Sequence, residues 1–267
     1  MPVITLTSDW GKRDHYLASL KGSILSRFPD LMAIDISHEI NHFDILQASY
    51  IIRSSYSKFP KGTAHVILLT TSAASNSGKR TTKTEPLLAI EAGGYYFVGV
   101  DSGIFSLILP DEEKRIFRLH DKEFTTYENL WLQLIEVANH LARGEKPEEI
   151  GDQVIEIKQT YVLQPSIDKD SIRATVIYID SFGNLIFNIT REQFYQAGEG
   201  RPFSIFLNKS ENAIKTISKM YNEVEEGEAV ALFNSDCYLE IGLNNANAQT
   251  LLGIKIHQSV RIEFHDR

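Results

Sequence analysis

Strand-like and helix-like segments alternate over the first 70 residues of the chain, and this order constrains the fold more than any other feature of the sequence. Residues 3–7, 31–36 and 65–69 are short apolar or β-branched runs of the kind found in strands. Between them, residues 14–28 and 43–59 repeat apolar side chains at three- and four-residue spacing, as one face of a helix does. This order predicts parallel strands joined by crossover helices, and therefore an α/β domain.

The residues that follow extend this domain. Strand candidates at 87–91 and 95–100 are joined by a short turn with Gly93 and Gly94, which predicts a hairpin and therefore a mixed, mainly parallel sheet. The last clear helix covers 129–143 and ends before a glycine.

The rest of the chain has an all-β pattern. After a charged, irregular stretch, turns separate short strand candidates at 174–179, 185–188, 203–207, 229–233, 238–241 and 260–264. We therefore predict an α/β domain over residues 1–165 and a small antiparallel β-barrel domain over residues 166–267.

Charge and cysteine content exclude several classes of partner. The first predicted domain has 17 basic and 21 acidic side chains and the second has 10 and 14, so each carries a net charge of −4 and neither attracts nucleic acid or anionic lipid. No apolar run approaches the roughly 20 residues that span a bilayer. Because Cys237 is the single cysteine and the first residues lack signal-peptide features, we expect a cytoplasmic protein.

Residues 38–42 match the H-E-x-x-H pattern of zinc proteases. That chemistry requires His38 and His42 on one face of a helix, with Glu39 as general base. Here the five residues lie between a strand and the start of the next helix, so we expect a loop and no metal site.

A second motif, Gly78-Lys79-Arg80, is similar to part of a phosphate-binding loop. Such a loop needs a glycine five residues before Gly78 and a Ser or Thr after the lysine. The chain has Ala73 and Arg80 at these positions, so a polar exposed loop is the better interpretation.

Polar residues follow the strands at the edge where α/β sheets bind ligands. Asp9 comes after the first strand, beside a glycine turn, and a carboxylate there accepts hydrogen bonds from ribose hydroxyls. Asp14 either serves the same site or is an acidic residue in the first turn of a helix. In the second domain, the polar clusters suit either turns or recognition of a purine and an amino-acid group; they contain Asp180, Asn184, Asn234, Ser235, Asn244 and Asn245.

The chain as a whole resembles the S-adenosyl-L-methionine hydroxide adenosyltransferase family, which also contains the adenosyl-fluoride and adenosyl-chloride synthases. Five segments in the family's order carry the resemblance: TLTSDWGKRDHYLASLKGSIL, IDISHEINHFDILQASYII, FPKGTAHV, GVDSG and YIDSFGNL. The resemblance implies an α/β domain followed by a β-barrel domain. It also implies that three copies of the chain assemble into a homotrimer. It also implies S-adenosyl-L-methionine as substrate or ligand, with no further cofactor, bound between one subunit's first domain and its neighbour's second.

The resemblance also assigns ligand-binding roles. Asp9 would hold the ribose hydroxyls, and Phe43 would pack near the ribose. Asp180 and Ser235, in the cluster that begins at Asn234, would bind the methionine amino-acid group, while Asn184 and the backbone near Asn244 and Asn245 would read adenine. Three more residues would line the site: Trp10, Asp14 and Tyr16.

The catalytic positions depart from the family pattern. Water-using members have V-D-P-G-V-G after the third strand, where this chain reads L-T-T-S-A-A, so Thr70 or Thr71 stands for the aspartate. Lys79 or Arg80 would supply the cation, and Asn129 or a neighbour replaces the histidine of H-G-R-D. Because a threonine hydroxyl is no base near neutral pH, the loss of general-base help raises the barrier by roughly 3–5 kcal/mol.

Two functions follow from this comparison of motifs. The first is cleavage of the 5′ C–S bond of S-adenosyl-L-methionine by water or halide, giving adenosine or a 5′-substituted adenosine plus methionine. The alternative is a catalytically impaired homologue that only binds adenosine or S-adenosyl-L-methionine.

Overall fold

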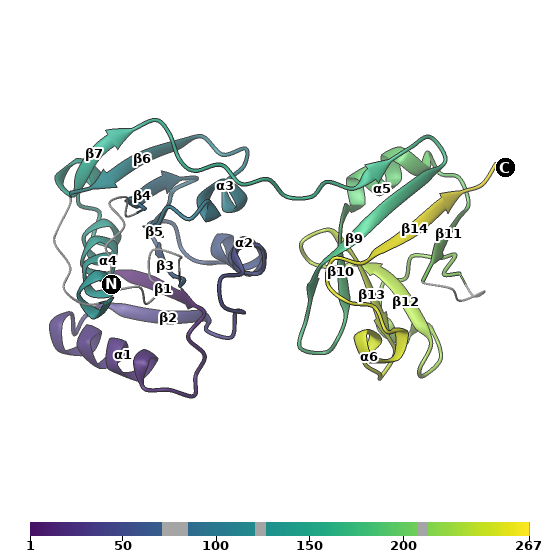
Figure 1. The fold of residues 1–267 in the computed structure, drawn as a ribbon, viewed down its shortest axis with the longest axis horizontal. Helices are drawn as coiled ribbons and strands as arrows, with labels where there is room; N and C mark the ends of the chain where they lie inside the picture. The colour runs from purple at the N-terminus through teal and green to yellow at the C-terminus, as the bar shows by residue number, and fades with distance from the viewer. Residues whose placement is uncertain (71–84, 121–126, 208–212, 267) are drawn as a thin grey trace, which may run out of the picture. The chain divides into compact units, whose positions relative to one another are not determined.

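The computed structural model describes residues 1–70, 85–120, 127–207 and 213–266, and the chain divides into two compact units, Met1–Tyr161 and Val162–Arg267 (Figure 1). No helix among these residues is both long and apolar enough to cross a membrane.

The first unit is built on a seven-stranded sheet with the order β2-β1-β3-β5-β4-β6-β7. Its strands are β1 Val3–Ser8, β2 Met32–Ser37, β3 Ala64–Leu68, β4 Leu87–Ala92, β5 Tyr95–Val100, β6 Lys114–Leu119 and β7 Gly151–Val154. β1 pairs in parallel with β2 and β3, and β3 with β5, whereas β4 and β7 run the opposite way. The predicted mixed, mainly parallel α/β sheet is confirmed.

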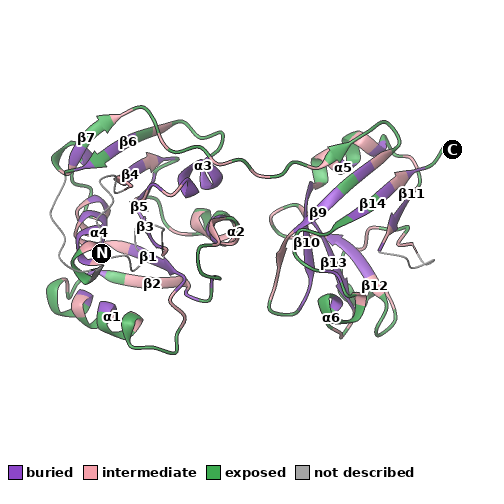
Figure 2. Cartoon of the chain, viewed as in Figure 1, coloured by how far each residue is buried: buried purple, intermediate pink, exposed green. Residues whose placement is uncertain are grey.

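Helices cover both faces of this sheet (Figure 1). They are α1 Tyr16–Arg27, α2 Ile45–Ser55, α3 Ile104–Ile108 and α4 Tyr127–Ala142, with short 3₁₀ turns at Tyr56–Lys58 and Pro147–Glu149. Val66 and Leu68 of β3 pack in the core beneath α1 and α4, while Ile67 between them packs with α2 and α3 on the other face. The alternation of side chains along a strand thus divides the core into two layers. In Figure 2, α3 is buried along its length, whereas α1 exposes its outer side.

The turns explain where the sequence prediction succeeded. Gly93 and Gly94 both have positive φ, 56° and 82°, as the tight β4–β5 hairpin requires. Gly144, at φ 81°, ends α4 in the left-handed conformation.

The sequence analysis missed α3, β6 and β7. β6 mixes basic side chains with apolar ones, and β7 lies in the stretch expected to be irregular.

The second unit is an antiparallel sheet with the order β11-β14-β9-β10-β13-β12 that curls into a half-barrel around an apolar core. Its strands are β8 Ser166–Ile167, β9 Ser171–Ile179, β10 Leu185–Thr190, β11 Phe203–Phe206, β12 Ala229–Phe233, β13 Tyr238–Leu243 and β14 Ser259–Phe264. A 3₁₀ turn, Tyr221–Glu223, and two helices, α5 Arg191–Gly198 and α6 Ala248–Leu252, complete it. α5 was not predicted, although Thr190 and Gln193 form a capping box at its start.

Candidate functional site

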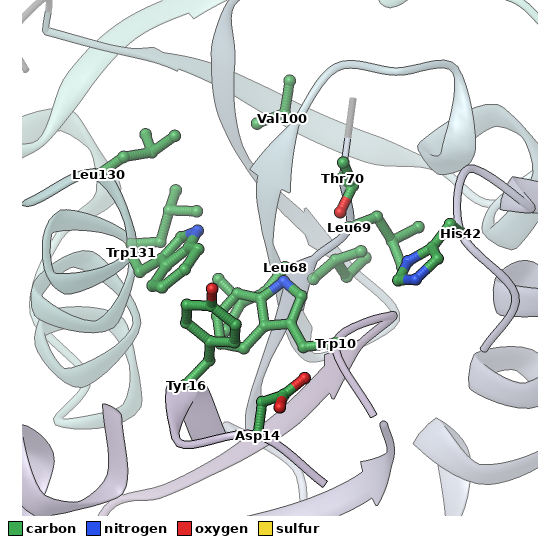
Figure 3. A pocket seen from close by; sticks show the side chains of 12 residues that line it. Trp10, Asp14, Tyr16, His42, Leu68, Leu69, Thr70, Val100, Leu130 and Trp131 are labelled. Atoms are coloured by element: carbon green, nitrogen blue, oxygen red, sulfur yellow. The ribbon is translucent and has the colours of Figure 1, made fainter. Parts of the chain in front are cut away.

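A cavity of about 450 Å³ lies in the first unit, where β1, β3 and β5 end and α4 begins. Its lining residues are Trp10, Asp14, Tyr16, His42, Ile67, Leu68, Leu69, Thr70, Val100, Leu130, Trp131 and Leu134 (Figure 3). Ligands of α/β proteins bind at this edge of the sheet, and the volume suits a small organic molecule.

One wall of the cavity is aromatic. The ring centroids of Trp10 and Trp131 are 3.9 Å apart, with the ring planes tilted by 37°. Tyr16 meets Trp131 edge-on, with ring centroids 6.5 Å apart. Trp10 and Trp131 are the two tryptophans of the chain. Flat half-buried rings of this kind bind heteroaromatic rings and organic cations, and Figure 3 shows Asp14 adding a carboxylate beside Trp10 and Tyr16.

Asp9 joins the loops beside the cavity. Parallel pairing of β1 with β3 sets Ser8 opposite Leu68, so the residues that follow each strand are neighbours. The buried Asp9 carboxylate accepts hydrogen bonds from the Thr70 N–H at 3.0 Å and the Thr70 hydroxyl at 3.0 Å, both to Oδ1. Its Oδ2 also accepts from the Phe43 N–H at 3.3 Å. Asp9 thereby connects the ends of β1 and β3 to the loop before α2.

His42 stands on that loop at the rim of the cavity. Its side chain is 70% exposed, and its Nδ1 is 3.8 Å from Asp9 Oδ2. Phe43, the next residue, has φ 65° and is exposed outside the cavity lining. Asp44 caps α2 by accepting a hydrogen bond from the Gln47 N–H at 2.9 Å. His42 is therefore followed directly by a left-handed residue and then by a capped helix.

The H-E-x-x-H motif lies in a loop, as predicted, and its two histidines serve different surroundings. His38 is fully buried, with Nδ1 2.7 Å from the Ser8 hydroxyl and Nε2 3.2 Å from Asp35 Oδ1. Burial lowers the pKa of His38 despite the nearby carboxylate of Asp35. This serine–histidine–aspartate chain is no nucleophilic triad, because Ser8 has no exposed surface for a substrate.

The structure places the sequence-predicted residues of this unit differently with respect to the cavity. Trp10, Asp14, Tyr16 and Thr70 line it, whereas Asp9 and Phe43 lie behind or outside the lining. Asn129 is exposed in the first turn of α4, next to the lining residues Leu130 and Trp131. Lys79 and Arg80 lie outside the described residues.

Two of these placements refine the sequence interpretation. Asp14 precedes α1, whose N-cap is His15 without a side-chain hydrogen bond, so the interpretation of Asp14 as a first-turn residue is wrong. Trp131 was not predicted as a site residue. The signal available in the sequence was a tryptophan at the start of a helix that follows a strand end.

In the second unit, Asp180 and Asn184 hold the turn between β9 and β10. Asp180 Oδ1 accepts from the Phe182 N–H at 3.0 Å and the Asn184 N–H at 2.8 Å, and Asn184 Nδ2 donates to Asp180 Oδ2 at 3.0 Å. The Tyr221 hydroxyl donates to buried Glu240, whose pKa is raised by burial. The interpretation of Asp180 and Asn184 as turn residues is therefore confirmed. Their ligand-binding role remains a prediction.

Two of the other polar residues of this unit also have local partners. Asn234 Oδ1 accepts from the Asp236 N–H and the Tyr238 N–H, both at 3.1 Å. Asn244 Nδ2 donates to the Val224 carbonyl at 2.8 Å. Ser235 and Asn245 are exposed, and Asn245 has φ 54°. Their assignment to methionine and adenine stays a prediction.

Potential metal ligands gather at the end of α4 within the described ranges, where His140, Glu145 and Glu149 lie together. His140 Nδ1 is 2.5 Å from Glu145 and its Nε2 is 3.6 Å from Glu149. Because the two ring nitrogens contact different carboxylates, each nitrogen already has a partner at the helix end, and we assign no metal to them.

The chain is a two-unit protein, with an α/β unit that carries an aromatic cavity at its strand ends, as a candidate site for a small organic ligand, and an antiparallel β unit after it. The chain belongs to the S-adenosyl-L-methionine (SAM) hydroxide adenosyltransferase family: the model of the family's N-terminal domain matches residues 4–151, and that of its C-terminal domain matches residues 174–261.

Individual relatives extend over almost the whole chain. The chain is similar to the (R)-S-adenosyl-L-methionine hydrolase of Methanocaldococcus jannaschii, with 27% identity over 282 residues, covering 99% of this chain and 97% of the relative. It is 24% identical to the fluorinase of Nocardia brasiliensis, covering 98% and 97% of the two chains. The crystal structure of an uncharacterized conserved protein from Thermotoga maritima has the same fold, with a TM-score of 0.82, 22% identity and coverage of 98% and 99%.

Proposed function

We propose that the protein binds S-adenosyl-L-methionine in the cavity of the first unit and hydrolyses its ribose 5′ C–S bond. Water forms a bond to C5′, the C5′–S bond breaks, and its electron pair goes to sulfur, which becomes the neutral thioether of methionine. The other product is adenosine, and one proton is released. The observation that carries this proposal is the aromatic, acid-bearing cavity at the strand ends of a chain from this family.

The chemistry of the cavity suits this ligand. The faces of Trp10 and Trp131 offer stacking for adenine and an electron-rich surface for the sulfonium cation. The Asp14 carboxylate adds negative charge on the same wall. Relatives named as S-adenosyl-L-methionine hydrolases and fluorinases support the same ligand class.

Water is favoured over halide as the nucleophile by one feature of the cavity. His42 is a potential proton acceptor on the lining, and water needs such a group while halide has no proton to lose. Because the chain is similar to fluorinases, halide is the competing nucleophile that the experiment must test.

The alternative, ligand binding without turnover, is favoured by Thr70. Its hydroxyl already donates to Asp9, so it offers no base for water at the position where water-using members have an aspartate. The second candidate function is therefore a protein that binds S-adenosyl-L-methionine or adenosine and releases it unchanged.

One experiment separates these functions. The purified protein is incubated with S-adenosyl-L-methionine, with and without added fluoride or chloride, and adenosine, 5′-halogenated adenosine and methionine are separated by chromatography. Adenosine and methionine in equal amounts support hydrolysis, and a halogenated product supports halide attack. Calorimetric binding of S-adenosyl-L-methionine or adenosine without either product supports the binding function. If the protein binds neither ligand, hydrolysis, halide attack and the binding function are all contradicted.

We also propose that the protein is a homotrimer, in which Asp180, Asn184 and the polar clusters near Asn234 and Asn244 reach the ligand of a neighbouring copy. The likeness of the chain to its family supports this assembly. Sedimentation equilibrium tests it: the mass of three 30.2 kDa chains is expected, and a monomer at micromolar concentration contradicts it.

A further inference from the structure

We propose that His42 is the general base of the reaction and that Asp9 is the residue that positions it. This inference rests on the proposed hydrolysis of S-adenosyl-L-methionine. It assigns the proton-accepting role to a side chain that the sequence analysis associated only with a zinc motif.

The first argument is the choice of proton acceptors in the cavity. Among the described residues that line it, the side chains that accept a proton are Asp14 and His42. Asp14 lies with Trp10 and Tyr16, on the side that the proposed function gives to the cationic ligand. His42 lies across the cavity from Trp131, near Thr70 (Figure 3). A water molecule on the His42 side would thus face a ligand stacked on the aromatic wall.

The second argument is the carboxylate behind the imidazole. Asp9 Oδ2 is 3.8 Å from His42 Nδ1, and the Asp9 side chain has no exposed surface. Hydrogen bonds from the Thr70 N–H and hydroxyl and from the Phe43 N–H fix that carboxylate. A carboxylate beside Nδ1 favours the tautomer with hydrogen on Nδ1, which leaves the Nε2 lone pair to accept a proton. Distances between catalytic partners are often long before substrate binds.

The third argument is the loop that carries His42. The Asn41 N–H donates to Gln47 Oε1 at 2.7 Å, and the Phe43 N–H donates to Asp9. His42 is therefore anchored on both sides along the backbone while its side chain remains 70% exposed. Such a residue can be truncated without opening a void in the core.

In the proposed step, His42 Nε2 takes one proton of the attacking water as its oxygen bonds to C5′. The C5′–S bond breaks at the same time, its electron pair remains on the methionine sulfur, and the imidazolium later returns the proton to solvent. Thr70 contributes indirectly, by holding Asp9 in place.

The test uses the full-length protein with His42→Ala and His42→Gln, and His120→Gln as a matched control on an exposed histidine outside the cavity lining. Removal of the base is expected to lower kcat by about 10²- to 10⁴-fold. The dissociation constant for S-adenosyl-L-methionine, measured by calorimetry, should change little, and His120→Gln should keep wild-type kinetics. Added imidazole should restore turnover to His42→Ala in a concentration-dependent way, because the vacated side-chain position is open to solvent.

Asp9→Asn provides the readout for positioning. Asp9→Asn should lower kcat when His42 is present, with circular dichroism confirming the fold, and should lower it no further in His42→Ala; an equal loss in both backgrounds overturns the positioning role.

Each result decides one question. Turnover by His42→Ala at the wild-type rate, or a loss of kcat that imidazole does not restore, overturns the assignment of His42 while leaving hydrolysis intact. A wild-type protein that produces no adenosine instead overturns the proposed function, and the base with it.

Discussion

Asp9 and Thr70 are joined through both donors of the threonine: the backbone N–H donates to Asp9 Oδ1 at 3.0 Å and to Oδ2 at 3.1 Å, and the hydroxyl donates to Oδ1 at 3.0 Å. The pair connects the ends of β1 and β3 directly beside the cavity. Thr70, one of the two threonines that the resemblance sets against the family's aspartate, therefore donates to a buried acid at the end of the neighbouring strand.

The stability of this pair can be measured by replacing Thr70 with Val. The variant loses the hydroxyl donor to a buried carboxylate but keeps the N–H donor, so the free energy of unfolding should fall by about 1.5–3 kcal/mol. Urea denaturation measures the change. The free energy of unfolding should fall clearly less in Thr70→Ser, which retains the hydroxyl. An equal fall in both variants would assign the effect to packing.

The aromatic wall should dominate ligand affinity. Trp131→Ala removes the ring that packs against Trp10 and lines the cavity, so S-adenosyl-L-methionine should bind about tenfold or more weakly, in line with about 1–3 kcal/mol for a stacked base. Calorimetry provides the measurement. Trp131→Phe keeps a ring and should retain most of the affinity, and unchanged binding by Trp131→Ala would place the ligand elsewhere.

Asp14 should distinguish a cationic ligand from a neutral one. Asp14→Asn removes the carboxylate with little change in shape, so S-adenosyl-L-methionine should bind about two- to fivefold more weakly, the range expected for an exposed charge. Adenosine has no sulfonium, and its affinity should be unchanged. The difference should shrink in high salt, and an equal loss for both ligands would contradict a charge effect.

A buried histidine should make the protein less stable in acid. His65 is packed beside Phe97 and bonded to the Thr5 hydroxyl at 2.8 Å, and burial lowers its pKa to about 4. Since the unfolded chain binds this proton near pH 6.5, the contribution of neutral His65 is present above that pH and is lost as pH falls toward 4. The loss between pH 7.5 and 4.5 should be about 2–3 kcal/mol.

His65→Gln tests this prediction, because glutamine retains a partner for Thr5 and does not titrate. The free energy of unfolding of the variant should depend less on pH than that of the wild type. Parallel pH profiles for the two proteins would assign the acid sensitivity to other groups.

The Asp180 turn should depend on Gly183. This glycine has φ 86°, and a Cβ there would lie 2.2 Å from Asn247 Nδ2, on the residue whose side chain caps α6. Gly183→Ala should therefore lower the free energy of unfolding by more than the roughly 1 kcal/mol of backbone strain alone. Gly227→Ala is the matched control, since it has φ 82° and nothing within 4 Å of its Cβ. Equal effects in thermal melting would contradict a clash.

Local patterns predicted most of the elements because each depends on its own residues. The β4–β5 hairpin follows from two adjacent glycines, and the first helices follow from apolar spacing. β6 was missed because, beside the edge strand β7, its outward side chains are lysine and arginine, which hide the strand pattern. The H-E-x-x-H loop was predicted correctly, yet nothing local distinguishes its buried His38 from its exposed His42.

The sequence by itself determined the α/β sheet, the following antiparallel unit and the resemblance to one family, because hydrophobic period, turn residues and ordered motifs are properties of contiguous segments. The trimer and the cytoplasmic location remain predictions from that sequence. Only the tertiary structure decided that Trp10 packs against Trp131 and that Asp9 lies behind His42. These contacts join distant segments, and the order and pairing of β1, β3 and β5 place their ends at one edge of the sheet.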